Sequence, residues 1–96
     1  MIYKDALEIE FQIDNIPYER EKPFPVFYKD HLLKRQYNAD FVVFGNVMLE
    51  VKAVSGTVDK HYELVLNYLR VSNCRIGLLV NFGEGSLKYK RVVLTK

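Results

Sequence analysis

The 96-residue chain contains one cysteine, no tryptophan and no long apolar run. A single cysteine cannot form an internal disulfide, which excludes a disulfide-stapled secreted scaffold and favours a reducing cytoplasm. The longest apolar runs, such as residues 41–44, are far shorter than the ~20 residues that span a bilayer. Asp5, Glu8 and Glu10 lie where a signal peptide would need an apolar core. We therefore expect a cytoplasmic protein that has no membrane partner.

The chain is also too short for a second domain, so we expect a single domain over residues 1–96. Its 49% hydrophobic and 27% charged residues are ordinary globular usage, which argues against disorder. Residues 1–48 hold six Lys and Arg against eight Asp and Glu, whereas residues 49–96 hold eight against four. This basic second half permits contact with a polyanion, although solvated surface explains most excesses of this size.

Hydrophobic periodicity and turn residues predict an α/β chain in the order α-β-β-β-α-β-β. The Gly45-Asn46 pair predicts a hairpin turn, and residues 83–86 predict another turn. The predicted helices are residues 2–13 and 59–71, and the predicted strands are residues 23–28, 37–44, 47–54, 75–80 and 88–94.

Residues 2–13 have the periodicity of an amphipathic helix. At about 100° per residue, its apolar side chains share one broad sector: Ile2, Tyr3, Ala6, Leu7, Ile9 and Ile13. Glu10 projects into this sector, where a carboxylate needs a partner, a metal ion or water. The alternative is a glutamate at the helix edge whose end reaches solvent.

The predicted hairpin carries Asp40 on one strand and Glu50 and Lys52 on the next. Residues two apart on a strand point to the same face, so Glu50 and Lys52 lie side by side. Two carboxylates can hold a hard divalent ion, and a neighbouring lysine can orient or deprotonate a water and offset developing charge. This set suits phosphodiester hydrolysis. The alternative is an ordinary Glu/Lys pair on a solvated sheet face.

The length of the turn decides whether these side chains meet. With a two-residue Gly45-Asn46 turn, Asp40 lies opposite Val51 and faces away from Glu50. The metal site therefore requires a three-residue loop or a β-bulge, which shifts the register by one residue. Gly45 suits such a loop, because glycine readily takes the left-handed conformation.

Short motifs of a known family occur along nearly the whole chain. They include Tyr3-Lys-Asp-Ala-Leu-Glu-Ile-Glu, Tyr18-Glu-Arg-Glu, Pro25-Val-Phe-Tyr, Asn38-Ala-Asp-Phe-Val-Val, Leu49-Glu-Val-Lys-Ala, Leu66-Asn-Tyr-Leu and Gly77-Leu-Leu-Val-Asn-Phe-Gly. With these motifs the sequence resembles the GxxExxY protein family, a branch of the PD-(D/E)XK nuclease superfamily. The resemblance implies a restriction-endonuclease-like α/β core, with a central mixed sheet flanked by helices. It also implies that Asp40, Glu50 and Lys52 occupy the catalytic positions of the superfamily.

The sequence departs from the family pattern at its start. Tyr3 matches the last residue of the motif that names the family, so the preceding Gly and Glu would fall before Met1. In related folds that Glu approaches the metal site from the first helix. Glu10 is the candidate for this carboxylate role.

A second departure lies in the predicted helix over residues 59–71. The family usually carries Gln between the matched His61 and Tyr68, on the side of the helix that faces the site. This chain has Leu64 there, and leucine can neither position a water nor bind a phosphate.

The leading hypothesis is a Mg²⁺- or Mn²⁺-dependent nuclease that acts on DNA or RNA. In this hypothesis Asp40 and Glu50 bind the metal with Glu10 as an auxiliary ligand, and Lys52 assists the attacking water. A third alternative is a protein that works only as a homodimer, because a core of this size is too small to wrap a duplex alone. The predicted substrate contacts are His61, Tyr68, Lys88, Lys90 and Arg91.

The competing hypothesis is a catalytically inactive PD-(D/E)XK-like module that binds nucleic acid or a protein partner. The late start of the motif and Leu64 favour this alternative, whereas the intact Asp40, Glu50 and Lys52 favour the enzyme.

Overall fold

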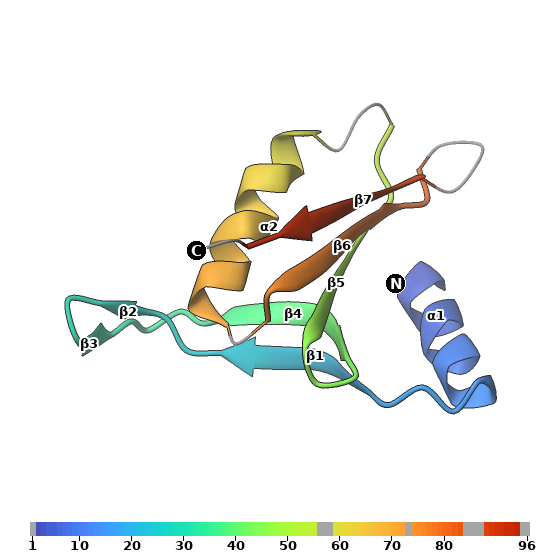
Figure 1. Ribbon diagram of the computed structural model, residues 1–96, viewed down its shortest axis with the longest axis horizontal. Coiled ribbons are helices and arrows are strands. Elements are labelled where there is room, and N and C mark those ends of the chain that lie inside the picture. Colours follow the sequence, from blue (N-terminus) through green and yellow to red (C-terminus); the bar gives the residue numbers. More distant parts are fainter. Residues whose placement is uncertain (1, 56–58, 73, 84–87, 95–96) are drawn as a thin grey trace.

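The computed structural model describes residues 2–55, 59–72, 74–83 and 88–94, without the side chains of Asp59, Lys60 and Lys88. The helices and strands follow one another along the chain as drawn in Figure 1. They are α1 (Ile2–Ile13), β1 (Tyr18–Phe24), β2 (Phe27–Tyr28), β3 (His31–Leu32), β4 (Tyr37–Val43), β5 (Val47–Lys52), α2 (Asp59–Val71), β6 (Ile76–Asn81) and β7 (Lys88–Val93).

The main sheet has five strands in the order β1-β4-β5-β6-β7. The pair β5 and β6 is parallel, because α2 carries the chain from one strand back to the start of the next. The other neighbours are antiparallel, so the sheet is mixed. The predicted α/β architecture, with helices packed on a central mixed sheet, is confirmed.

Two apolar clusters lie on opposite faces of this sheet. The cluster under α2 consists of Ala39, Val42, Met48, Val65, Leu69, Cys74, Leu79 and Val92. The cluster on the α1 side consists of Phe41, Val43, Leu49 and Val80, with Leu7 and Phe11 of α1 packed against it. The lone Cys74 is therefore a buried packing residue.

The segment between β1 and β4 differs from the prediction. The strand predicted over residues 23–28 instead runs from Tyr18 to Phe24, and a separate small hairpin of β2 and β3 follows it. Pro25 lies between the two, where it has no ladder N–H to donate. Figure 1 shows that this hairpin projects from the body of the molecule at the end opposite α1.

The apolar sector predicted for α1 faces the core only in part. Leu7 packs against the core, but Ile2, Ile9 and Ile13 are 80%, 55% and 65% exposed, whereas Lys4 on the other side is buried. Ion pairs from Arg20 of β1 to two carboxylates of α1 accompany this orientation of the helix.

Two further predictions from the sequence concern a turn and the membrane. The predicted turn over residues 83–86 falls largely outside the described residues. Among the residues that are described, no helix is both long and apolar enough to cross a bilayer.

Candidate active site

The β4–β5 hairpin closes with a three-residue loop. Val43 pairs with Val47, so Phe44, Gly45 and Asn46 form the loop. Phe44 and Gly45 take positive φ angles of 55° and 75°, which is the left-handed conformation that such a loop needs. The hairpin therefore has the three-residue loop that the proposed metal site requires, and not the two-residue turn.

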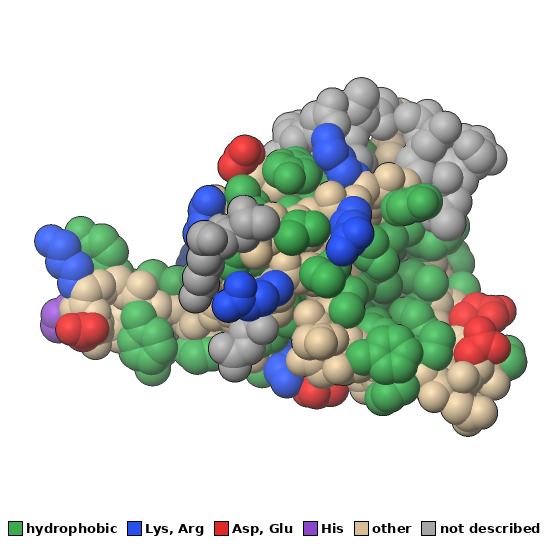
Figure 2. Space-filling view, viewed as in Figure 1, with side chains coloured by type: hydrophobic (Ala, Val, Ile, Leu, Met, Phe, Trp, Pro, Cys, Tyr) green, Lys and Arg blue, Asp and Glu red, His purple; other side chains and the backbone are tan. Residues whose placement is uncertain are grey.

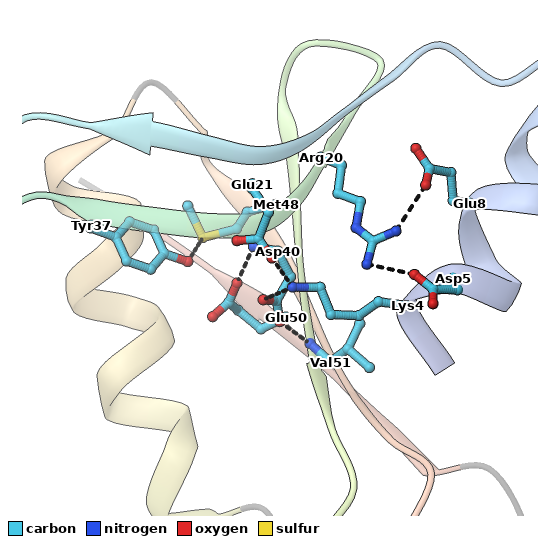
Figure 3. A network of polar contacts seen from close by, with 10 residues as sticks. All are labelled: Lys4, Asp5, Glu8, Arg20, Glu21, Tyr37, Asp40, Met48, Glu50 and Val51. Atoms are coloured by element: carbon cyan, nitrogen blue, oxygen red, sulfur yellow. Dashed lines mark hydrogen bonds and ion pairs between the residues drawn. The ribbon is translucent and has the colours of Figure 1, made fainter. Parts of the chain in front are cut away.

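This register places Asp40 opposite Glu50, because the last ladder pair before them joins Phe41 to Leu49. Beyond that pair, backbone N–H groups donate to side-chain carboxylates instead of to backbone carbonyls. The backbone N–H of Asp40 donates to Glu50 Oε2 at 2.9 Å, and the N–H of Val51 donates to Asp40 Oδ2 at 2.8 Å. Figure 3 shows the two carboxylates turned toward one another between the strands.

A break in the neighbouring pair of strands accompanies this geometry. The β1–β4 ladder pairs Arg20 with Phe41 and Lys22 with Ala39 but omits Glu21 and Asp40 between them. Glu21 has a φ of 54°, a left-handed conformation that few side chains adopt. The regular backbone pairing of β1 with β4 is therefore interrupted at Asp40.

Lys4 of α1 reaches the acidic pair across the sheet. Its Nζ lies 3.0 Å from Asp40 Oδ1 and also hydrogen-bonds to Glu21. Burial lowers the pKa of Lys4, but the hydrogen bonds and negative charges of Glu21 and Asp40 outweigh it, so the net shift of the pKa is upward. Lys4 is therefore held as a cation beside Asp40.

Glu50 is the most perturbed acid of the site. It is 5% exposed, and burial together with the charge of Asp40 raises its pKa to about 7, against the lowering effects of the Asp40 N–H, Tyr37 and Lys52. A carboxyl in this state accepts additional positive charge readily, because a cation would offset the repulsion from Asp40.

Two stacked tyrosines border the acidic pair on the α2 side. The rings of Tyr37 and Tyr68 are nearly parallel, with centroids 3.6 Å apart. Burial and the negative charges of Glu50 and Asp40 raise the pKa of both hydroxyls. Among the predicted substrate residues, Tyr68 thus stacks on a tyrosine that lies beside the acidic pair.

Comparison with known protein families shows to which superfamily the chain belongs. Residues 1–92 match the family model described as PD-(D/E)XK nuclease superfamily. The chain belongs to this superfamily. The match does not extend to the GxxExxY branch, whose membership stays a prediction.

A solved structure shares the fold of this superfamily member. The chain is similar to SSO0001, whose crystal structure aligns with a TM-score of 0.73 at 15% sequence identity. The alignment covers 96% of this chain and 48% of that protein, so the chain spans about half the length of SSO0001. At 15% sequence identity the similarity shows a shared fold and nothing about function. No curated protein matches the sequence.

The end of β5 in this PD-(D/E)XK domain is held by a residue that the sequence analysis did not single out. Asn81 is buried, and its Oδ1 accepts hydrogen bonds from the N–H groups of Val54 and Gly83 at 3.0 and 2.9 Å. Its Nδ2 donates to the Val54 carbonyl at 2.9 Å. In addition, the Lys52 carbonyl accepts from Phe82 N–H at 2.8 Å. These contacts fix the backbone immediately after Lys52.

Phe82, the residue after Asn81, connects this end of β6 to α1. Its ring stacks on Tyr3 with centroids 4.6 Å apart and an interplanar angle of 8°. Gly83 is required by packing, since a Cβ there would lie 2.2 Å from the Val54 carbonyl oxygen. The Asn-Phe-Gly run over residues 81–83 is one of the family motifs, but its contacts with Val54 and Tyr3 could not be predicted without the fold.

The structure separates the other predicted site residues. Glu10 is exposed and lies about 120° around α1 from Lys4. Lys90 packs over the Tyr62 ring of α2 at 4.9 Å, whereas the adjacent Arg91 points to the opposite face of the sheet. His61 lies in the first half of α2, seven residues before Tyr68. The side chain of Lys88 is outside the described residues.

The acidic pair fits a divalent ion by its donor set and its electrostatics. Carboxylate oxygens are the ligands that Mg²⁺ prefers, and this ion commonly takes only one or two protein carboxylates, with water and substrate phosphate completing its shell. The described residues include no group of three or more His, Cys, Asp and Glu that could enclose a metal. Asp40 and Glu50 would therefore hold such an ion as an open, two-carboxylate site.

Proposed function

We propose that this domain hydrolyses phosphodiester bonds of DNA or RNA with the help of Mg²⁺ or Mn²⁺. The observation that carries the proposal is the approach of Asp40 and Glu50 across the hairpin, with Lys52 beside Glu50. Two of the chain's own hydrogen bonds, 2.9 and 2.8 Å long, hold these carboxylates in register. The superfamily match over residues 1–92 supports nuclease-like chemistry.

Each residue of the proposed site has a chemical task. Asp40 and Glu50 would hold the metal, which would supply charge neutralisation at the phosphate and activation of a water. Lys52 lies on the same strand face as Glu50, and its charge already lowers the pKa of Glu50. From there its ammonium can orient the attacking water and offset negative charge that develops on the phosphate.

The substrate strand would enter along an open groove of about 290 Å³ that begins at the two stacked tyrosines. Arg35 and Asn38 line it together with Tyr37 and Tyr68. An arginine can bind a backbone phosphate bidentately, and exposed aromatic rings can stack on unpaired bases. We therefore propose that Tyr68 contacts the strand next to the scissile phosphate, and that Arg35 contacts a neighbouring phosphate.

The test is a cleavage assay on plasmid DNA, single-stranded DNA and RNA, with Mg²⁺ or Mn²⁺ and with EDTA. Cleavage should require the metal, and Lys52→Ala should lower its rate about 100-fold or more, as removal of a positioned acid–base group does. Lys22→Ala is the matched control, because Lys22 pairs with Glu19 on the surface of β1. Equal cleavage by Lys52→Ala and Lys22→Ala would overturn the proposed role of Lys52.

A second function, binding without cleavage, is favoured by one contact. The Lys4 ammonium lies on Asp40 Oδ1, an oxygen that a metal ion would use. If this ion pair persists in the presence of metal, the domain binds nucleic acid without cutting it. Salt-dependent binding in gel-shift assays, together with no metal-dependent cleavage by either the native chain or Lys4→Met, would establish this second function.

A further inference from the structure

The outer side of α1 is apolar but is not covered by the sheet. Ile2, Ala6, Ile9 and Ile13 are all exposed, and at about 100° per residue they fall within a sector of about 60°. The opposite side of the helix, which faces the sheet, carries Leu7, Phe11 and the buried Lys4. We call these four residues the α1 outer face. A contiguous apolar face of this kind on a small domain marks an interaction surface.

A second apolar surface lies on the projecting hairpin, here called the arm and comprising residues 27–35. Two short strands without a packed face are barely stable alone in water. The large apolar side chains of the arm are nevertheless between 44% and 66% exposed: Phe27, Tyr28, Leu32 and Leu33. The arm therefore also has the composition of a docking element.

The two surfaces carry opposite charge. Residues 2–14 include four acidic residues and one lysine. Asp5 and Glu8 pair with Arg20, and the lysine is buried in ion pairs with two other carboxylates, so Glu10 and Asp14 give the exposed side of α1 its negative charge. Residues 27–35 include three basic residues and one aspartate. Pairing of two α1 outer faces would bring like charges together, whereas pairing of the arm with α1 brings opposite charges together. Charge complementarity therefore selects the arm as the partner of α1.

The arm cannot reach the α1 of its own chain. The two elements lie at opposite ends of the molecule, which is 43 Å along its longest axis (Figure 1). Figure 2 shows the same separation in space-filling form. The hairpin end carries lysine or arginine among hydrophobic side chains, together with acidic and histidine side chains, and carboxylates lie near the other end. The partner that carries the matching surface is therefore a second copy of this chain.

We propose that the arm of one copy docks on the α1 outer face of a second copy, and that the second arm docks on the first α1. Reciprocal docking gives a closed two-fold dimer in which both apolar surfaces of both copies are covered. The two contacts together double the buried area, which brings the interface closer to the roughly 1,200–2,000 Å² of stable complexes. This inference does not depend on the proposed nuclease activity.

The test measures molar mass by light scattering and the dimer Kd by analytical ultracentrifugation. The native chain should be a dimer. Ile9→Asp in α1 and Leu32→Asp in the arm should each raise the dimer Kd about tenfold or more, because each buries an unpaired carboxylate. Tyr89→Asp is the matched control, since Tyr89 is exposed on β7 and belongs to neither surface, so this change should leave the Kd unchanged. Circular dichroism checks that each variant is folded.

Mixing the two variants separates the proposed contact from other dimers. The Ile9→Asp copy keeps an intact arm and the Leu32→Asp copy keeps an intact α1, so their mixture should form a heterodimer through one native contact. A dimer that Leu32→Asp does not weaken, or a mixture that forms no heterodimer, would overturn the proposal. A native chain that stays monomeric at its highest soluble concentration would also overturn it.

Charge exchange gives an independent check. Glu10→Lys with Asp14→Lys should weaken the dimer, and so should Lys29→Glu with Lys34→Glu. A chain that carries all four changes should regain much of the lost affinity. If the arm changes instead abolish binding of a single-stranded oligonucleotide and leave the molar mass unaltered, the arm binds nucleic acid and the dimer proposal is wrong.

Discussion

Lys4 and Asp40 are 36 residues apart in sequence, yet they form an ion pair of 3.0 Å at the site where two carboxylates converge. The lysine side chain is 7% exposed and that of the aspartate is 19% exposed, so water screens the pair weakly. A monovalent ammonium thus neutralises part of a charge that the proposed metal would also neutralise. Lys4 and the metal should compete for Asp40.

Replacement of this lysine should reveal the competition. Lys4→Met should lower the free energy of unfolding by about 1–3 kcal/mol in EDTA, because it leaves Asp40 partly buried without its cation. Mn²⁺ or Mg²⁺ should restore much of the loss, and the metal should bind Lys4→Met more tightly than the native chain. Thermal melts over a metal titration measure both effects. Lys22→Met serves as the control, and weaker metal binding by Lys4→Met would contradict the model of competition.

The raised pKa of Glu50 makes stability depend on pH in a defined direction. The pKa of Glu50 is about 7 in the folded state and near its ordinary value of 4.5 in the unfolded chain. Between these two pH values the folded protein therefore keeps the proton that the unfolded chain has lost. The folded state therefore binds more protons between these values, and the free energy of unfolding falls as pH rises from about 4.5 to 7. The expected decrease from this group is about 2–3 kcal/mol in metal-free buffer.

Denaturant unfolding at a series of pH values measures this decrease. Glu50→Gln keeps the shape of the side chain but cannot ionise, so its stability should be flatter over the same pH range. Glu63→Gln, an exposed change on α2, is the control and should keep the native profile. An unchanged pH profile in Glu50→Gln would show that another group is responsible.

The buried Asn81 should matter to both stability and activity. Asn81→Ala removes the partners of three backbone groups, the N–H and carbonyl of Val54 and the N–H of Gly83. We expect a loss of about 2–4 kcal/mol in the free energy of unfolding. Cleavage should also fall under conditions where the variant is fully folded, because the backbone after Lys52 is released. Asn46→Ala, in the exposed hairpin loop, should change neither quantity by a comparable amount.

The sequence predicts the order of the elements well because that order follows from periodicity and turn residues. It also predicts that Asp40 and Glu50 can meet, but the condition, a three-residue loop, depends on the left-handed Phe44 and Gly45 and not on hydrophobic pattern. The orientation of α1 is a different case. Most of its apolar sector is turned away from the sheet, and the side that faces the sheet combines the packing of Leu7 and Phe11 with ion pairs to Arg20. Such long-range pairs leave no periodic signal.

The projecting hairpin and the role of Lys4 were missed for a related reason. Two-residue strands are too short to give an alternating pattern, so β2 and β3 could not be distinguished from a loop. Lys4 lies outside the predicted apolar sector of residues 2–13, and a lysine in such a position is usually solvated. Only the fold shows that this lysine contacts Asp40.

Leu64 offers a direct test of the departure from the pattern of the GxxExxY family. It lies one turn before Tyr68 on the same side of α2 and is 41% exposed, so a polar replacement should fold normally. Leu64→Gln would introduce the amide that the resembling family usually carries there. An amide that hydrogen-bonds the attacking water or a phosphate oxygen would contribute about 1 kcal/mol, which corresponds to a rise of about fivefold in kcat/KM.

The exposed neighbour Glu63→Gln controls for a general effect of glutamine on α2. If Leu64→Gln melts like the native chain and cleaves no faster, this turn of α2 does not contact the substrate. The path of the strand must then lie nearer the groove bordered by Tyr37 and Arg35.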